Sequence, residues 1–221
     1  MAVVVGGGGP PAIDRAALGD LGDEPLVIAA DSGLAHARAL GLPVDRVVGD
    51  MDSVERSVLE AAARAGTRIE RHPEAKDATD LALAVDAALS ARPARLVVVT
   101  GAGDRFDHAL AIALSLAALQ DAPPRCEAWI GVAHLWVVRG RATLAGSPGD
   151  LLTLVPAHGP ARGVTTTGLL YPLVDEDLDA GTSRGVSNEW VDEVATVRLR
   201  AGVLLAVAPG VRGTHWARSH R

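Results

Sequence analysis

The feature that most constrains the fold is a regular alternation of short apolar runs with longer amphipathic runs, which continues from the start of the chain to about residue 138. Runs such as Leu26–Ala30 and Arg95–Thr100 have the length and composition of buried strands. Between them, Leu81, Val85 and Leu89 recur at the spacing of one helical face. This alternation predicts an α/β domain with a doubly wound, mostly parallel sheet, similar to a Rossmann fold.

The same pattern predicts where the individual elements lie. Strands are expected at 3–5, 26–30, 46–48, 67–70 and 95–100, and helices at 35–40, 54–65, 80–89 and 107–119. The last helix has almost no polar face, so we expect it to be buried. Because aromatic residues make up only 3% of the chain, the core must be filled by Ala, Val and Leu.

The pattern changes after residue 138. Helical periodicity ends, and frequent glycines and prolines separate short apolar runs such as 151–155 and 203–207. Short strands with turn residues between them predict a smaller antiparallel β-sandwich. We therefore predict two domains, an α/β domain over residues 1–138 and a β-sandwich domain over residues 139–221.

Charge and cysteine content argue against several classes of protein. The formal net charge is -6, and no cluster of Lys or Arg matches a nucleic-acid backbone, so no nucleic-acid partner is expected. No apolar segment has membrane-spanning length and no basic residue precedes the first apolar run, so we expect neither anchor nor signal peptide. The single cysteine, Cys126, cannot form an internal disulfide, which favours a reducing, cytoplasmic location.

Four clusters of acidic and small polar residues each follow a predicted strand or begin a predicted helix. They are Asp31-Ser32-Gly33, Gly49-Asp50-Met51-Asp52-Ser53, Lys76-Asp77-Ala78-Thr79-Asp80 and Gly101-Ala102-Gly103-Asp104-Arg105-Phe106-Asp107-His108. Because the carboxyl ends of the strands in a doubly wound sheet share one edge, we expect these clusters to meet in a crevice there.

A crevice with several carboxylates has an electrostatic conflict, since like charges a few ångströms apart resist ionisation. A hard divalent cation such as Mg²⁺, bound together with the phosphates of a nucleotide, removes this conflict. Lys76 and Arg105 are then the local positive side chains available for phosphate oxygens.

Each cluster also has a simpler interpretation. Asp and Gly after a strand are common turn residues. Thr79 is a suitable N-cap for the helix that follows, and Asp80 suits its first turn. It is the occurrence of four such clusters in one order that favours a functional site.

Two generic motifs compete with this interpretation. The glycines at 6–9 suggest a dinucleotide fingerprint, but position 11 is Pro11 where glycine or alanine is required, so a turn is the more economical interpretation. The run from Asp50 to Val54 resembles the aspartyl-phosphate signature of dehalogenase-type phosphatases. That signature normally follows the first strand, whereas two predicted strands precede it here.

Taken together, these motifs resemble those of the thiamine pyrophosphokinase family. The four clusters are similar to its Ala-Asp-Gly-Gly, Gly-Asp-x-Asp-Ser, Asp-x-Thr-Asp and Gly-Arg-x-Asp-His elements. In the second half, the run from Gly168 to Leu173 resembles Gly-Leu-Lys-Tyr-Pro-Leu, and Ser187-Asn188-Glu189 resembles Ser-Asn-Glu. The chain departs from the family at Ser32, where glycine is frequent, and at Leu170, where the family has lysine.

The resemblance implies transfer of diphosphate from ATP to the hydroxyethyl group of thiamine, with AMP as the second product. It implies Mg²⁺ held by Asp52 and Asp77, with Asp50 and Asp80 as further catalytic residues in or near the same shell. It also implies a homodimer whose thiamine site is built by both chains. The residues expected to bind ATP are Asp31, Ser32, Lys76, Thr79, Gly101, Arg105, Asp107 and His108.

In the second domain, Tyr171, Ser187 and Asn188 are the expected thiamine contacts, or the residues that support them. Tyr171 is equally compatible with an aromatic packed in the sandwich. Three other functions stay open at this point: a diphosphokinase acting on a pterin alcohol, a dehalogenase-type phosphatase and a non-catalytic nucleotide or thiamine sensor.

Overall fold

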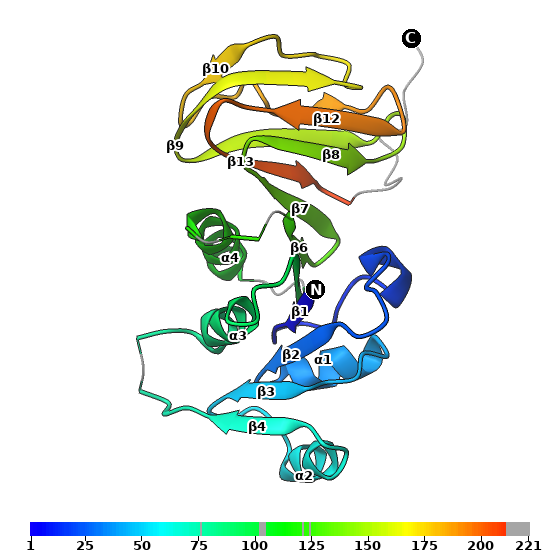
Figure 1. Ribbon diagram of the computed structural model, residues 1–221, viewed down its shortest axis with the longest axis vertical. Coiled ribbons are helices and arrows are strands. Elements are labelled where there is room, and N and C mark those ends of the chain that lie inside the picture. The colour runs from blue at the N-terminus through cyan, green and yellow to red at the C-terminus, as the bar shows by residue number, and fades with distance from the viewer. Residues whose placement is uncertain (76, 102–104, 121, 124, 211–221) are drawn as a thin grey trace. The chain divides into compact units, whose positions relative to one another are not determined.

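The computed structural model describes residues 1–75, 77–101, 105–120, 122–123 and 125–210. The chain divides into two compact units, of which the first is Met1–Ile112 with Leu119–Gly131 and the second is Ala113–Ala118 with Val132–Arg221. Figure 1 shows the elements of both units. In the described part of the chain, no helix is long and apolar enough to cross a membrane.

Among its described residues, the first unit contains six parallel strands. They are β1 (Ala2–Val5), β2 (Leu26–Ala30), β3 (Arg46–Gly49), β4 (Arg68–Arg71), β5 (Arg95–Thr100) and β6 (Arg125–Ile130). Their order is β4-β3-β2-β1-β5-β6, with each neighbouring pair parallel. The chain winds outward from β1 to β4 and then returns to the other side of β1 at β5, so the predicted doubly wound sheet is confirmed.

Helices cover both faces of this sheet. They are the 3-10 helix η1 (Arg15–Leu18) and the α-helices α1 (Gly33–Ala39), α2 (Arg56–Arg64), α3 (Asp80–Leu89) and α4 (Phe106–Ala118). Alternate strand residues such as Val3, Val5 and Val97 pack in one cluster with residues of η1 and α1. In Figure 1, α3 lies on the opposite face from α1 and α2. The predicted bounds of α3 and β5 agree residue for residue with the structure.

At the strand ends away from the acidic clusters, a partly buried ion pair links η1 to the sheet. Arg95, the first residue of β5, pairs with Glu127 of β6. The same guanidinium donates to the carbonyl oxygens of Leu18 at 3.0 Å and of Asp20 at 2.7 Å. The Arg95 guanidinium therefore has hydrogen-bond acceptors on both the sheet and the η1 segment, which offset its partial removal from water.

The prediction that the helix at 107–119 is buried is wrong. Only Leu116 and Ala117 of α4 are buried, whereas Phe106, Leu110 and Leu114, spaced four residues apart, are exposed. An apolar helix becomes buried only where another element covers it, and the described residues cover only part of α4.

The second unit is antiparallel. Its strands are β7 (Ala133–Val138), β8 (Arg141–Ala145), β9 (Leu151–Thr167), β10 (Glu176–Leu178), β11 (Asn188–Glu189), β12 (Val194–Arg198) and β13 (Ala201–Ala208). β13 pairs with β7 and β9, and β12 pairs with β8 and β9. A core that includes Leu152, Leu154 and Trp190 lies between the strands, which confirms the predicted sandwich.

The prediction that glycines and prolines separate short strands in this unit is wrong for β9. The glycines and prolines after residue 151 were expected to separate short strands, but Pro156, Gly159, Pro160 and Gly163 lie inside the single 17-residue strand β9. Gly159 has a φ of 126°, and β9 changes register between its pairings with β13. The turn-forming residues therefore bend one strand that pairs in turn with β13, β10 and β12.

Candidate functional site

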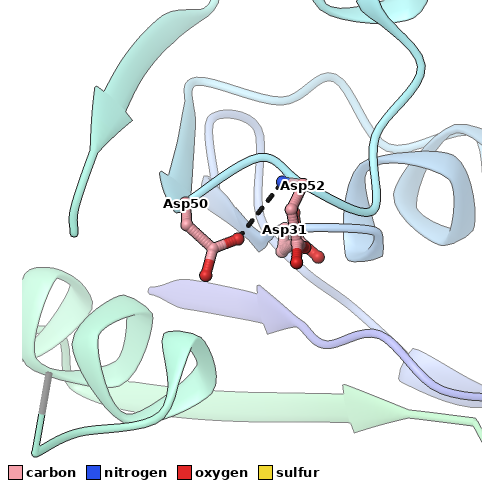
Figure 2. A group of neighbouring side chains, drawn as sticks. All are labelled: Asp31, Asp50 and Asp52. Atoms are coloured by element: carbon pink, nitrogen blue, oxygen red, sulfur yellow. Dashed lines mark hydrogen bonds between the residues drawn. The ribbon is translucent and has the colours of Figure 1, made fainter. Parts of the chain in front are cut away.

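Three carboxylates from two neighbouring strands meet at the carboxyl edge of the parallel sheet. Asp31 follows β2, and Asp50 and Asp52 follow β3. One oxygen from each carboxylate lies within 4.8 Å of the other two, and Figure 2 shows the three side chains pointing toward a common space. Because β2 and β3 are adjacent and parallel, their ends bring together residues about 20 positions apart in the sequence.

The loop after β3 is held in an uncommon backbone conformation. Met51 has a φ of 68°, in the left-handed region that non-glycine residues rarely adopt. Its side chain is buried in a cluster with Leu34 and Val47, and this burial offsets the cost of the conformation. The backbone N–H of Asp52 donates to Asp50 Oδ1 at 3.2 Å (Figure 2), so the turn orients both carboxylates.

Asp31 is the least solvated of the three acids. It also has a positive φ, 47°, and only 9% of its surface is exposed. Burial raises the pKa of the Asp31 carboxyl, hydrogen bonds from Ser32 and Ser53 oppose the rise, and the charges of Asp52 and Asp80 add to it. Its Oδ1 is buried and has no hydrogen-bond partner among the described residues.

The donor set suits a small hard cation. Three converging carboxylates repel one another when all are ionised. The pKa of the Asp31 carboxyl is raised first by burial and then by the charges of Asp52 and Asp80. Oxygen donors of this kind are the ligands that Mg²⁺ prefers, with the remaining positions filled by water and phosphate oxygens. Ser53 assists the arrangement, since its Oγ donates to Asp52 Oδ1 at 2.9 Å. The residues therefore fit a magnesium site.

The third acidic cluster contributes one residue beside these acids. Asp80, the first residue of α3, lies close to Asp31, because a Cβ built on Gly49 would meet Asp80 Cγ and Asp31 Cβ, each at 3.1 Å. Thr79 caps α3 by accepting from the N–H of Ala82 at 3.2 Å. Asp77 is exposed between β4 and α3 and does not belong to the three-carboxylate group. Lys76 lies outside the described residues.

A cleft of about 550 Å³ extends along the same edge. Its lining comes from the glycine loop after β1, from the ends of β2, β5 and β6, and from the beginnings of α1, α3 and α4. The lining residues are Gly6, Gly7, Gly8, Ala30, Asp31, Ser32, Asp80, Leu81, Thr100, Gly101, Arg105, Phe106, His108, Ala109, Ile112 and Ile130. The cleft lies where the winding of the sheet reverses, between β1 and β5, the usual place for a ligand in this class of fold.

Two glycines allow the close packing that shapes the cleft. A Cβ on Gly33 would lie 2.1 Å from the carbonyl oxygen of Val5, and one on Gly101 would lie 1.6 Å from that of Gly9. Neither position has room for a side chain. The glycine loop thus packs against the start of α1 on one side and the end of β5 on the other. It therefore shapes the cleft, in addition to forming the turn that the sequence suggested.

Arg105, a positively charged side chain that lines the cleft, forms an ion pair with Asp107. Arg105 donates from Nε to Asp107 Oδ1 at 2.9 Å and from Nη2 to Oδ2 at 2.6 Å. This guanidinium holds the pKa of the Asp107 carboxyl well below its usual range. Both side chains are exposed, so the pair is solvated and exchangeable. His108 lines the cleft in the first turn of α4.

The candidate residues of the second unit form a separate group. Asn188 is only 3% exposed; its Nδ2 donates to the carbonyl oxygen of Tyr171 at 2.7 Å, and its Oδ1 accepts from the N–H of Tyr171 at 3.0 Å. Tyr171 is 57% exposed as a residue, so it is not the packed aromatic considered from the sequence. Ser187, with a φ of 56°, donates its N–H to Thr153 Oγ1 at 3.1 Å.

Sequence reasoning identified most of the residues at the edge of the sheet but missed some. It placed Asp31 among the acids that meet in one crevice, but it named Asp31 as a nucleotide contact and Asp52 with Asp77 as the metal ligands, whereas the three-carboxylate group of the structure is Asp31, Asp50 and Asp52. It also omitted Ser53, which was visible within the second cluster, and Thr100, which lines the cleft. Thr100 carries no motif, and only its place at the end of a central strand would have identified it.

Comparisons with known proteins agree with this architecture. Residues 21–128 match the family model "Thiamin pyrophosphokinase, catalytic domain", and residues 143–204 match "Thiamin pyrophosphokinase, vitamin B1 binding domain". The chain is 23% identical over 211 residues to the thiamine pyrophosphokinase of Bacillus subtilis (strain 168), covering 90% of this chain and 94% of that protein. It is 26% identical over 183 residues to thiamine pyrophosphokinase 2 of Arabidopsis thaliana, covering 74% of this chain and 65% of that protein.

A solved structure shares the fold. The crystal structure of thiamine pyrophosphokinase from Bacillus subtilis superposes with a TM-score of 0.78 at 21% identity, covering 94% of this chain and 98% of that chain. The likeness therefore extends through both units.

Proposed function

The chain belongs to the thiamin pyrophosphokinase family, and we infer that it transfers a diphosphate group from ATP to the hydroxyl of thiamine, giving thiamine diphosphate and AMP. The observation that carries this inference is the match of both family domains, in order, to residues 21–128 and 143–204. The carboxylates and cleft of the first unit have the chemistry that a nucleotide and its metal require.

The reaction forms one bond and breaks another at phosphorus. The hydroxyl oxygen of thiamine bonds to the β-phosphorus of ATP, and the bond from that phosphorus to the oxygen bridging to the α-phosphate breaks. The electron pair leaves with AMP, and the hydroxyl proton passes to a base. Catalysis of such a transfer depends on positioning and on neutralisation of charge, rather than on a covalent intermediate with the protein.

The acidic residues are proposed to hold Mg²⁺ against the triphosphate. Asp31, Asp50 and Asp52 supply three converging oxygens, and Asp77 is retained from the family resemblance as a second ligand with Asp52. When bound, the metal neutralises charge on the phosphate oxygens. Asp80, beside Asp31, completes the proposed acidic set, in which one carboxylate accepts the hydroxyl proton.

The cleft is proposed to hold the nucleotide. Ser32, Gly101, Arg105 and His108 line it, and the planar fork of Arg105 suits two phosphate oxygens. Arg105 would exchange its solvated contact with Asp107 for the phosphate. Lys76, Thr79 and Asp107 are the other proposed ATP-binding residues. Residues 1–138 are accordingly assigned to ATP binding and catalysis.

Residues 139–221 are proposed to bind thiamine. The exposed ring of Tyr171 could stack on the cationic thiazolium, an interaction on the order of 1 kcal/mol. Asn188 would support this ring through the Tyr171 backbone, with Ser187 beside it.

A homodimer is proposed to complete the thiamine site. The second unit exposes Leu170, Tyr171 and Val174 within one short segment, and apolar groups gathered in this way often mark an interface. A cytoplasmic location is proposed as well, because a chain with a single cysteine, the buried Cys126, forms no internal disulfide and suits a reducing compartment.

The test is a product analysis. The protein is incubated with Mg²⁺, ATP and thiamine, and the products are identified by mass spectrometry. We expect AMP and thiamine diphosphate in equal amounts, neither of which forms when thiamine or Mg²⁺ is omitted. Release of ADP, or of phosphate without thiamine diphosphate, would exclude the proposed reaction.

A further inference from the structure

Thr100 has a buried hydroxyl that the fold does not use. It is the last residue of β5 and only 4% exposed. Its Oγ1 has no hydrogen-bond partner among the residues that the structure describes. Buried hydroxyls normally have a partner, because desolvation without one is costly. Thr100 also lines the cleft, so its hydroxyl can be satisfied by a molecule bound there.

The position of Thr100 along the sheet edge indicates which part of a ligand it meets. In the strand order β3-β2-β1-β5-β6, the carboxylates follow β3 and β2, whereas Thr100 ends β5. Two strand spacings separate β5 from β2, or about 10 Å. The methyl group of Thr100 faces Gly6, since a Cβ built on Gly6 would lie 2.9 Å from its Cγ2.

The surroundings of Thr100 are also more apolar than the carboxylate end. Its register partner on β6 is Ile130, and Ala109 and Ile112 of α4 line the same cleft. The cleft has acids at one end and the glycine loop in the middle, and at the other end apolar side chains stand together with Arg105 and His108 at the start of α4. This distribution matches a nucleoside triphosphate, whose phosphates need charged partners and whose base needs apolar ones. Its metal-bound phosphates would lie toward Asp31 and its nucleoside toward Ile130.

We propose that Thr100 is a nucleotide-binding residue whose hydroxyl hydrogen-bonds the nucleoside moiety of the ATP co-substrate. This inference rests on the proposed function and adds a residue to it. Thr100 contributes to the affinity for the nucleotide, and it takes no part in the transfer of the diphosphate group.

The experiment compares Thr100→Val, which removes the hydroxyl and keeps the shape, with Thr100→Ser, which keeps the hydroxyl. Binding of ATP with Mg²⁺ is measured by calorimetry without thiamine, and kinetics are measured with both substrates. For Thr100→Val we expect ATP affinity to fall about 3- to 10-fold, the scale of one hydrogen bond. The kcat and the KM for thiamine should stay within about 2-fold of the parent values, and Thr100→Ser should keep most of the affinity.

Thr67→Val is the matched control. The Thr67 hydroxyl donates to the carbonyl oxygen of Val44 at 2.8 Å, away from the cleft lining. Thr67→Val should lower the melting temperature and leave the affinity for ATP unchanged. Thr100→Val should leave the melting temperature of the ligand-free protein unchanged or raise it. Unchanged ATP affinity in Thr100→Val, or a loss of stability like that of Thr67→Val, would overturn the proposal.

Competition assays locate the contact. Thr100→Val should weaken inhibition by AMP and leave inhibition by tripolyphosphate unchanged, and equal weakening of both would refute the nucleoside contact. If the parent protein binds ATP but forms no thiamine diphosphate, the proposed function fails while the calorimetric test of Thr100 stands. If the parent is active and Thr100→Val binds ATP normally, only the inference about Thr100 fails.

Discussion

At the residue scale, the acidic group illustrates a conflict between folding and function. Asp31 is buried, next to other carboxylates, in a left-handed backbone conformation. Each of these features costs free energy in the absence of a cation. Asp31 is therefore expected to lower the stability of the metal-free protein and to contribute to binding of the cation.

Asp31→Asn tests this conflict. The folded-state pKa of the Asp31 carboxyl is raised above its ordinary value of 3.8, so ionisation disfavours the fold. The penalty is absent at pH values below 3.8 and is complete above the folded pKa. Asparagine tolerates the same φ, so at pH 7.5 in EDTA the variant should melt at a higher temperature than the parent.

The same variant should lose about 100-fold or more in Mg²⁺-dependent turnover, the scale on which one charge-stabilising group acts. Asp52→Asn is the control, because its carboxylate is exposed; it should lose activity with little change in melting temperature. An Asp31→Asn protein that melts lower than the parent in EDTA would contradict the account.

Asn188 gives a second prediction at this scale. Asn188→Asp replaces the donor to the carbonyl oxygen of Tyr171 with a second acceptor, in a buried position. We expect the KM for thiamine to rise several-fold and the melting temperature to fall, because the backbone that carries the Tyr171 ring loses a partner. Calorimetric ATP affinity should not change, and an unchanged KM for thiamine would count against the supporting role.

At the element scale, the strands of the second unit are joined by side chains as well as by backbone pairing. Where β9 changes register against β10, Asp177 of β10 accepts the N–H of Gly163 at 2.9 Å and the guanidinium of Arg162 at 3.1 Å. Both donors lower the pKa of the Asp177 carboxyl, the Gly163 N–H most strongly. The carboxylate thus replaces ladder hydrogen bonds that the bulge removes.

The pH dependence of stability tests this function. A lowered folded-state pKa means that the Asp177 carboxylate stabilises the fold at pH values above its ordinary pKa of 3.8, and that this contribution disappears as the pH falls through the folded pKa. Asp177→Ala should therefore lower the urea midpoint at pH 7, with a difference from the parent that shrinks below about pH 3.8.

Asp179→Ala is the comparison for this prediction. Asp179 shares the ion pair to Arg162 at 3.2 Å, but the hydrogen bond from Gly163 goes to Asp177. Its effect at pH 7 should be smaller than that of Asp177→Ala. A pH-independent difference between parent and Asp177→Ala would show that the carboxylate charge is not what matters.

At the scale of the whole molecule, the two units have separate cores and separate candidate sites. All the residues that line the cleft belong to the first unit, and the hydrophobic core around Trp190 belongs to the second. Damage to the second core should therefore lower stability without changing the intrinsic affinity for nucleotide.

Gly146→Ala tests this independence. An added Cβ would lie 2.4 Å from the Trp190 ring, and overpacking of this kind typically costs about 1–3 kcal/mol. The variant should melt at a lower temperature, yet at 20 °C its calorimetric affinity for ATP with Mg²⁺ should match the parent. A parallel loss of ATP affinity would show that nucleotide binding depends on the second core.

The amino-acid sequence by itself determined the order and type of most elements of the first unit, because hydrophobic periodicity reports which face of each segment is buried, but it did not predict η1 or β6. It also predicted that acids following different strands would converge, since parallel strands end at one edge of a sheet. The sandwich followed from the loss of helical periodicity, although Pro156 and Gly159 bend one strand where a boundary was expected.

Only the tertiary structure decided which groups share a contact. Asp31 joined Asp50 and Asp52 because β2 and β3 are neighbours, whereas no local pattern distinguished Asp31 from Asp77. Burial of α4 and the unused hydroxyl of Thr100 likewise depend on what other segments place beside them. The hydrophobic periodicity of a segment indicates which of its faces favours burial. Whether that face is buried, and which residues cover it, depends on segments that are distant in the sequence.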